Sequence, residues 1–342
     1  MKFSNYIIIF IYLLLSYPLF YYAYKFGNPD FGNVDFYNYY HFYKDWDFKN
    51  IVSPFNTRLV SSFFIFLFNK IGFFYNAEIN YHNPYIDQKV FFNAIFFNYI
   101  CFIANAYLIY RIILKFFSNY LVAFIFGILT FLSFGALFYS LNTLTESFSV
   151  LLFSLIFFLY LKKSYWVLPF LLLATIQREY IFLVMAPVSL IHFLFLKTDR
   201  KYFSSIFICS IIGFAAYYIL RKTFFYTPQF DSQLDVTLIF NKLFHSNFPM
   251  GEYIRQSFLN QNIFLLYLFV VAYKYFKKMA FDKINLIVIL VLYFETHFVS
   301  IVEELGNSCG RYFYITLAML LFYLAKEIKP LFSSHLNFSE NV

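Results

Sequence analysis

Long apolar stretches separated by short polar segments run along the whole chain. Ten of these stretches are long enough, or nearly long enough, to cross a bilayer as helices of about 20 residues. They lie at residues 6–26, 90–110, 119–138, 147–161, 164–177, 181–196, 202–220, 262–276, 284–302 and 311–325. The pattern predicts an all-α fold, a polytopic transmembrane helical bundle of about ten spans that forms a single domain over residues 1–342.

A further apolar stretch, residues 59–74, is interpreted differently because of the charges that follow it. If it crossed the membrane, residues 75–88 would face the cytoplasm with Glu78 and Asp87 but no Lys or Arg. Cytoplasmic loops are usually rich in Lys and Arg, so this topology is disfavoured. We expect instead an interfacial or re-entrant helix within a large first outer loop, about residues 27–88. A second long outer loop is expected at about residues 221–261.

The charges of the other loops set the predicted orientation. Only Lys2 precedes the first apolar stretch, which is long, aromatic and without a small-residue cleavage site, so we expect a retained helix rather than a signal peptide. With the N-terminus inside, the short inner loops are basic and most acidic residues fall outside, which favours cytoplasmic termini. Arg221 and Lys222 are exceptions, because this topology places them outside.

Composition excludes a soluble globular domain. Hydrophobic residues make up 61% of the chain and charged residues only 13%. The formal net charge of +8 follows from the basic inner loops, so no nucleic-acid partner is indicated. Cys101, Cys209 and Cys309 are far apart, which indicates neither a disulfide framework nor a metal cluster. No metal-site spacing such as HExxH occurs, so no cofactor is assigned, and a divalent cation would need carboxylates brought together by folding.

Four polar clusters fall at the predicted outer ends of the helices. They are the first outer loop with Asp30, Asp35 and Arg58, TLTES with Glu146, QREY with Arg178 and Glu179, and EELGNSCGRY with Glu303, Glu304, Arg311 and Tyr312. Ionisable groups at membrane depth are costly and usually functional. Their convergence on one face predicts that they approach one another in space and form one site.

Simpler interpretations exist for several of these residues. Arg178 and Glu179 would pair with each other at a helix turn, and Glu146 would be an acid favoured at a helix N-terminus. Arg311 with its neighbouring tyrosine would be an anchor at the membrane interface.

Two further groups of ionisable residues lie within apolar stretches and receive structural interpretations. Glu295 and His297 are interpreted as a buried pair that satisfy each other. His192 is interpreted as a hydrogen-bonded histidine of the core.

The polar motifs resemble those of a known family. DFYNYY followed by SPFNTRLV resembles the D-x-x-x-Y and P-[FY]-x-x-R-[LI] run of the C superfamily of integral membrane glycosyltransferases. This GT-C fold includes dolichyl-phosphate mannosyltransferases and bacterial aminoarabinose and arabinofuranose transferases. TLTES and QREY resemble two later motifs at helix ends, and EELGNSCGRY resembles an acidic ending followed by Arg-Tyr. One departure is that the family's acidic pair is often adjacent, whereas Asp30 and Asp35 are separated.

The resemblance implies a transferase that moves a sugar from a polyprenyl-phosphate-linked donor to an acceptor hydroxyl, with inversion. The acceptor would be a glycan, a lipid or a protein, and the site would face outward from a bacterial inner membrane. The implied base is Asp35, with Asp30 as the alternative, and the implied phosphate ligands are Arg58, Arg178 and Arg311. Supporting roles, in positioning the acceptor or orienting the arginines, fall to Glu146, Glu179, Glu303, Glu304 and Tyr312.

Other functional classes stay open from the sequence alone. A transporter or flippase for lipid-linked sugars would carry polar residues through the full membrane depth. A polymerase or ligase of O-antigen type has a long late outer loop, for which residues 221–261 would serve. A non-catalytic membrane scaffold would not need four ionisable clusters on one face.

Overall fold

The computed structural model describes residues 5–27, 35–47, 51, 55–72, 86–139, 141–225, 250–302 and 308–332. Asp30, Glu303 and Glu304 lie outside these ranges, and so does the side chain of Asp35. The described residues form helices and contain no strand, which confirms the all-α prediction. The helices are α1 (Asn5–Phe26), α2 (Asp35–Asp45), the short 3-10 helix η1 (Phe55–Thr57), α3 (Leu59–Ile71), α4 (Gln88–Phe117), α5 (Tyr120–Leu132), α6 (Phe134–Tyr139), α7 (Glu146–Leu161), α8 (Val167–Ala174), α9 (Tyr180–Phe195), α10 (Arg200–Thr223), α13 (Met250–Leu259), α14 (Asn262–Phe276), α15 (Lys283–Val302), α16 (Ser308–Ile315) and α17 (Leu317–Phe332).

Four of the described helices, α1, α4, α10 and α15, are long and apolar enough to cross a membrane. This agrees with a helical membrane protein. Other apolar helices are shorter: α7 and α9 have 16 residues each and α14 has 15. At about 1.5 Å per residue a helix of that length reaches roughly 24 Å, less than a hydrocarbon core of about 30 Å. The count of ten spans therefore stays a prediction.

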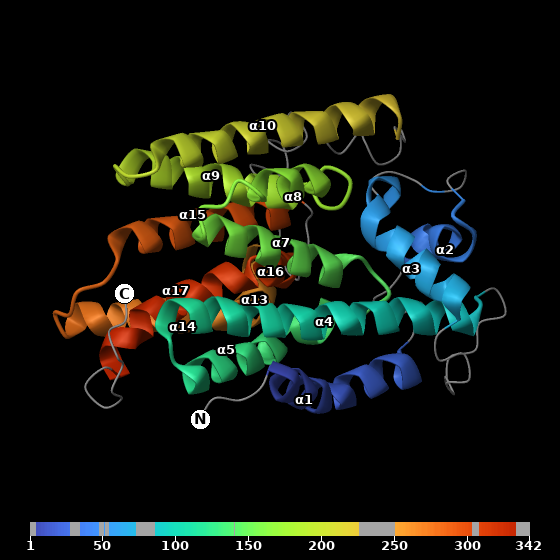
Figure 1. Cartoon of the computed structure of the whole chain (residues 1–342), viewed down its shortest axis with the longest axis horizontal. Coiled ribbons are helices and arrows are strands. Elements are labelled where there is room, and N and C mark those ends of the chain that lie inside the picture. Colours follow the sequence, from blue (N-terminus) through green and yellow to red (C-terminus); the bar gives the residue numbers. More distant parts are fainter. Residues whose placement is uncertain are drawn as a thin grey trace.

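The long helices lie roughly along one axis of the molecule (Figure 1). Helix α4 occupies the centre, where it packs against α1, α5, α7 and α17. Helices α9 and α10 pack against each other as an outer layer, and α15 joins that layer through α9. Helices α2 and α3 lie together at one end of the bundle.

Two apolar stretches that were predicted as single spans are each divided into two helices. The first breaks at Ser133, whose backbone is extended (ψ 141°). Its hydroxyl accepts a hydrogen bond from the amide nitrogen of Ala136 at 3.2 Å and so caps α6. The second breaks at Thr316, between α16 and α17. A Cβ at Gly135 would come within 2.2 Å of the Tyr314 Cβ, so this close approach of α6 to α16 requires glycine.

The first predicted outer loop contains α2 and α3. Helix α3 has 13 residues, about 20 Å at the usual rise, which is too short to cross a bilayer alone. It runs at a steep angle to the long helices (Figure 1). Gly72 ends the helix in a left-handed conformation (φ 76°), where glycine is favoured. The amide nitrogen of Leu59 donates to the carbonyl of Ile176 at 2.9 Å, which joins the start of α3 to the turn between α8 and α9.

Candidate functional site

Four residues from distant parts of the chain, Arg58, Glu146, Arg178 and Arg311, meet in what we call the arginine cluster. Arg311 donates through Nε to Glu146 Oε1 at 2.7 Å, and its Nη2 contacts the same oxygen. Arg178 Nη1 lies 3.2 Å from that oxygen as well. The side chains of Glu146 and Arg178 are 0% and 2% exposed. Arg178 and Arg311, which lie far apart in the sequence, therefore share Glu146 as a partner.

The arginines keep the Glu146 carboxyl ionised. Burial alone raises the pKa of Glu146, but Arg311, Arg178 and Arg58 together outweigh it and lower the pKa to about 2. Glu146 is the first residue of α7 and lies outside the four candidate spans. Glu179 behaves in the same way: burial raises its pKa, and nearby guanidiniums, Arg178 first, bring the pKa below its usual value.

Helix α2 is tied to the cluster through two tyrosines. Arg58 Nη1 donates to the Tyr39 hydroxyl at 2.5 Å, and the guanidinium lies 5.6 Å from the centroid of the Phe55 ring. The Tyr39 ring stacks on Tyr43 with centroids 5.7 Å apart. Tyr43 in turn donates its hydroxyl to the carbonyl of Thr143 at 3.0 Å. Asp35 is the first residue of this same helix.

Gln177 fixes the backbone around the cluster, a role that the sequence did not reveal although QREY contains it. Its Oε1 accepts from the amide nitrogen of Ser61 at 3.0 Å. Its Nε2 contacts the hydroxyl oxygen of Ser149 at 3.0 Å and that of Ser61 at 3.1 Å. One buried amide therefore joins α3, α7 and the turn before α9.

Arg221 was also missed as a site residue. It lies in the last turn of α10, it is buried, and its Nη1 donates to the Tyr217 hydroxyl at 3.1 Å. Its charge contributes to the lowered pKa of Glu179. The sequence did contain an indication, because Arg221 was one of the basic residues that the predicted topology placed among the acidic outer loops. A basic residue in that position is a candidate for a specific partner.

Several polar atoms of the cluster have no hydrogen-bond partner among the described residues. They are Glu146 Oε2, Arg58 Nε, Arg178 Nε and Arg178 Nη1, each buried. The 3.2 Å approach of Arg178 Nη1 to Glu146 Oε1 is an ion pair without hydrogen-bond geometry. A buried donor or acceptor without a partner costs about 1–3 kcal/mol, so such atoms are usually matched by a ligand or an ordered water. Guanidinium donors suit the oxygens of a phosphate, and a free carboxylate oxygen suits a hydroxyl. The arrangement can therefore hold an anion beside a hydroxyl group.

The tyrosine next to Arg311 extends the cluster toward α9 and α15. The Tyr312 ring lies against Tyr180 with centroids 4.4 Å apart. The Tyr180 hydroxyl and the hydroxyl of Thr296 are 2.8 Å apart and hydrogen-bonded. These two contacts connect α16 through α9 to α15.

The interpretation of Glu295 and His297 as a mutual pair is wrong. The Nδ1 atom of His297 is 2.9 Å from the Tyr253 hydroxyl, and its Nε2 is 3.1 Å from Gln261 Nε2. Glu295 Oε2 has no hydrogen-bond partner in the described part of the chain. Residues two apart on a helix do not face each other, which explains the error.

The interpretation of His192 is confirmed: its Nδ1 is hydrogen-bonded to the buried Tyr160 hydroxyl at 2.5 Å. Within the described ranges, no three His, Cys, Asp or Glu side chains are grouped so as to hold a metal ion.

A second buried charged group lies near the opposite ends of the helices. Lys274 Nζ is 2.5 Å from Glu327 Oε2, and both side chains are 2% exposed. The other Glu327 oxygen accepts from the amide nitrogen of Asp282 at 3.1 Å, and Lys326 Nζ lies 3.1 Å from Asp282 Oδ2. We call Lys274 and Glu327 the lysine–glutamate pair. The sequence analysis singled out neither residue, and helix packing buries both.

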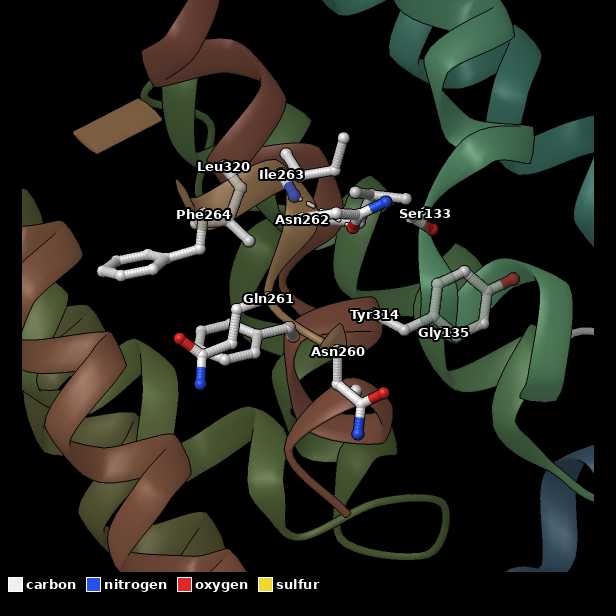
Figure 2. A pocket seen from close by; sticks show the side chains of 12 residues that line it. Ser133, Gly135, Asn260, Gln261, Asn262, Ile263, Phe264, Tyr314 and Leu320 are labelled. Atoms are coloured by element: carbon white, nitrogen blue, oxygen red, sulfur yellow. Dashed lines mark hydrogen bonds between the residues drawn. The ribbon is translucent and has the colours of Figure 1, made fainter. Parts of the chain in front are cut away.

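A small cavity lies where α13 meets α14 (Figure 2). Asn260, Gln261 and Asn262 line it, and Tyr314 approaches it beside Gly135. Asn262 Nδ2 donates to the carbonyl of Leu132 at 2.9 Å. With a volume of about 10 Å³ the cavity has room for roughly one water molecule, and it is too small for a sugar or a lipid.

Comparison of the chain with protein-family models, with curated proteins and with solved structures finds no match in any of the three.

Proposed function

We propose that the protein is a membrane glycosyltransferase that moves a sugar from a polyprenyl-phosphate-linked donor to an acceptor hydroxyl. The observation that supports this most directly is the arginine cluster, in which buried guanidinium donors of Arg58 and Arg178 have no acceptor among the described residues. Guanidinium groups engage phosphate oxygens bidentately and remain charged at all relevant pH values. A phosphate held there would accept hydrogen bonds from Arg58, Arg178 and Arg311.

The reaction also needs a base, and Asp35 is the proposed one. An acceptor hydroxyl has a pKa far above neutral, so a carboxylate must take its proton as the new bond forms. The acceptor oxygen bonds to the anomeric carbon, the bond to phosphate breaks, and the electron pair leaves with the phosphate oxygen. This direct displacement inverts the anomeric centre. In helix α2, position 35 comes about one turn before Tyr39 and two turns before Tyr43. Tyr39 is hydrogen-bonded to Arg58, and Tyr43 to the carbonyl of Thr143.

The other residues would serve the donor and the acceptor. Glu146 orients Arg178 and Arg311, and its Oε2, which has no partner in the described part of the chain, is suited to accept a hydrogen bond from a sugar hydroxyl. Glu179 and Tyr312 support the arginines, and Glu303 and Glu304 are proposed to position the acceptor. The site would face outward from a bacterial inner membrane, with the lipid tail of the donor in the bilayer.

The decisive experiment replaces the proposed base. Asp35→Asn keeps the shape and removes the proton acceptor, so transfer in reconstituted lipid should fall by about 10²- to 10⁴-fold. Binding of the lipid-linked donor should remain. Asp30→Asn is the matched control, with a smaller expected loss. Normal transfer by Asp35→Asn would exclude Asp35 as the base, and a loss confined to Asp30→Asn would assign the role to Asp30.

The same reconstituted vesicles separate this proposal from transport. A transferase forms a glycosylated product from donor and acceptor on one side of the membrane. A flippase changes the sidedness of the donor and forms no product. If wild-type vesicles supplied with each class of acceptor moved the donor across the membrane and formed no product, the protein would be a transporter and not a transferase.

A further inference from the structure

A cleft of about 670 Å³ lies between α9, α10 and α15 and shares no lining residue with the arginine cluster. It is lined by Phe182, Leu183, Ala186, Pro187, Ser210, Ile211, Phe214, Val291, Phe294, Glu295 and Phe298. Such a volume is within the range of about 300–1,000 Å³ that small-molecule sites have. Three of the wall residues, Ile211, Phe294 and Phe298, are 51%, 68% and 48% exposed, so the cleft is open at the surface.

The open side belongs to helices that suit a membrane. Helices α10 and α15 are both candidate spans, and their outward faces are largely exposed and apolar. A molecule that enters between them would therefore come from the bilayer. Glu295 lies seven residues, or about two turns, before the last residue of α15.

Among the described lining residues, Glu295 is the one that is ionisable. Its Oε2 is buried and has no hydrogen-bond partner among the described residues. Ser210, the other polar lining residue, donates its hydroxyl to the carbonyl of Ile206 at 2.8 Å. An ionisable side chain at membrane depth is costly and is usually kept for a partner.

We propose that this cleft binds an amphiphile with a cationic ammonium head, whose head contacts Glu295 and whose hydrocarbon chain fills the apolar walls. The carboxylate supplies the opposite charge and a hydrogen-bond acceptor. Four phenylalanines, Phe182, Phe214, Phe294 and Phe298, line the same cleft, and aromatic faces attract ammonium groups. An ammonium head favours the ionised form of this carboxyl group, whereas an alcohol of equal chain length brings no charge.

The cleft is suited to a cation, whereas the arginine cluster is suited to an anion. The inference stands without the proposed function, because its evidence is the cleft and a carboxyl oxygen that has no hydrogen-bond partner within the described ranges. Its test measures binding and not transfer, so failure of one leaves the other intact.

The experiment uses the purified full chain in maltoside micelles with dodecylammonium as the probe and dodecanol and dodecanoate as matched amphiphiles. Native mass spectrometry counts the bound probe, and thermal unfolding follows the stabilisation. Dodecylammonium should bind the wild-type protein at least tenfold more tightly than dodecanol. Equal binding of amine and alcohol by the wild-type protein would overturn the proposal without any variant.

Two substitutions locate the site. Glu295→Gln should weaken binding of dodecylammonium by about 10- to 100-fold, as expected for a lost charged hydrogen bond. Ala186→Phe keeps the carboxyl group, narrows the cleft and should weaken both the amine and the alcohol. Glu252→Gln removes an exposed carboxyl group of α13, 57% exposed, and should change nothing. Unchanged amine binding by Glu295→Gln, or an equal loss in Glu252→Gln, would show that the probe binds elsewhere.

Discussion

The arginine cluster and the lysine–glutamate pair are both buried, near opposite ends of the bundle, and they satisfy their charges differently. In the pair, one ammonium meets one carboxylate, and both Glu327 oxygens have partners. In the cluster, Arg178 and Arg311 share one oxygen of Glu146, while the other oxygen has no hydrogen-bond partner in the described chain. A matched pair is complete without a ligand. The unmatched cluster has the composition of a binding site.

The difference also separates stability from function. Taking a matched pair out of water costs several kcal/mol per ion, which the attraction between the two ions offsets only when the geometry is good. The lysine–glutamate pair links α14 to α17, so its contribution is to hold two helices together. The cluster joins α7, α16 and the turn before α9, and several of its donors have no acceptor among the residues that the structure describes. Removing a residue of the lysine–glutamate pair should therefore mainly lower stability, and removing a residue of the arginine cluster should mainly lower the proposed sugar transfer.

The largest effect is expected from breaking the pair on one side. Lys274→Met leaves the Glu327 carboxylate buried and unpaired, which should lower the free energy of unfolding by about 3–5 kcal/mol. The double variant Lys274→Met, Glu327→Leu should recover most of this loss, since matched apolar replacements are often neutral. Denaturant unfolding in micelles measures both. A double variant as unstable as the single one would show that the pair is more than a matched contact.

A smaller energetic effect, but a larger effect on activity, is expected at the cluster. Arg178→Gln should lower kcat/KM for sugar transfer by about 10²- to 10³-fold, the usual loss when a charged donor to the transition state is removed. Arg178→Lys should restore only part of it, because lysine cannot reproduce the planar fork of donors. Lys274→Met, assayed per folded molecule, is the control with normal transfer. Equal losses in Arg178→Gln and Lys274→Met would remove the functional distinction between the two ends.

Much of the architecture could be predicted from apolar periodicity. The stretch 262–276 coincides with α14, and 284–302 differs from α15 by one residue. The breaks at Ser133 and Thr316 could not, because the first is set by a contact between α6 and α16 that only the folded chain contains. A continuous apolar helix and one divided by a capping serine have nearly the same hydropathy pattern.

The candidate site shows the same limit. Topology placed Arg58, Glu146, Arg178 and Arg311 at one end of the helices, and the structure brings them together. The predicted topology could not identify Glu146 as the partner that Arg178 and Arg311 share, because this depends on how α7 packs against α16. The pair formed by Lys274 and Glu327 was missed because a charged residue near a helix end gives the same pattern whether it is solvated or buried.

An intermediate effect is expected from acid. The pKa of Glu146 is lowered to about 2 in the folded protein, below its usual value near 4.5. Its contribution to stability is therefore full above pH 4.5 and is lost as the pH falls through the folded pKa. As the pH falls from 4.5 to about 2, protonation of Glu146 should lower the free energy of unfolding of the wild-type protein by on the order of 1–3 kcal/mol. Glu146→Gln should show a correspondingly shallower slope, and Glu252→Gln the wild-type slope. An unchanged slope in Glu146→Gln would mean that its carboxyl group is not held ionised by the arginines.

The smallest effect is expected from an exposed ion pair, which tests whether burial or charge matching makes the lysine–glutamate pair important. Lys163 and Asp199 form a matched pair between the end of α7 and the start of α10, with side chains 53% and 35% exposed. Water already solvates both ions, so breaking an exposed pair leaves no buried charge and typically costs about 0–1 kcal/mol. Lys163→Gln should therefore change the free energy of unfolding by less than about 1 kcal/mol, and added salt should remove most of the difference. The measurement is denaturant unfolding at low and high salt beside Lys274→Met. A loss in Lys163→Gln as large as that of Lys274→Met would show that matching alone, without burial, sets the energy of these pairs.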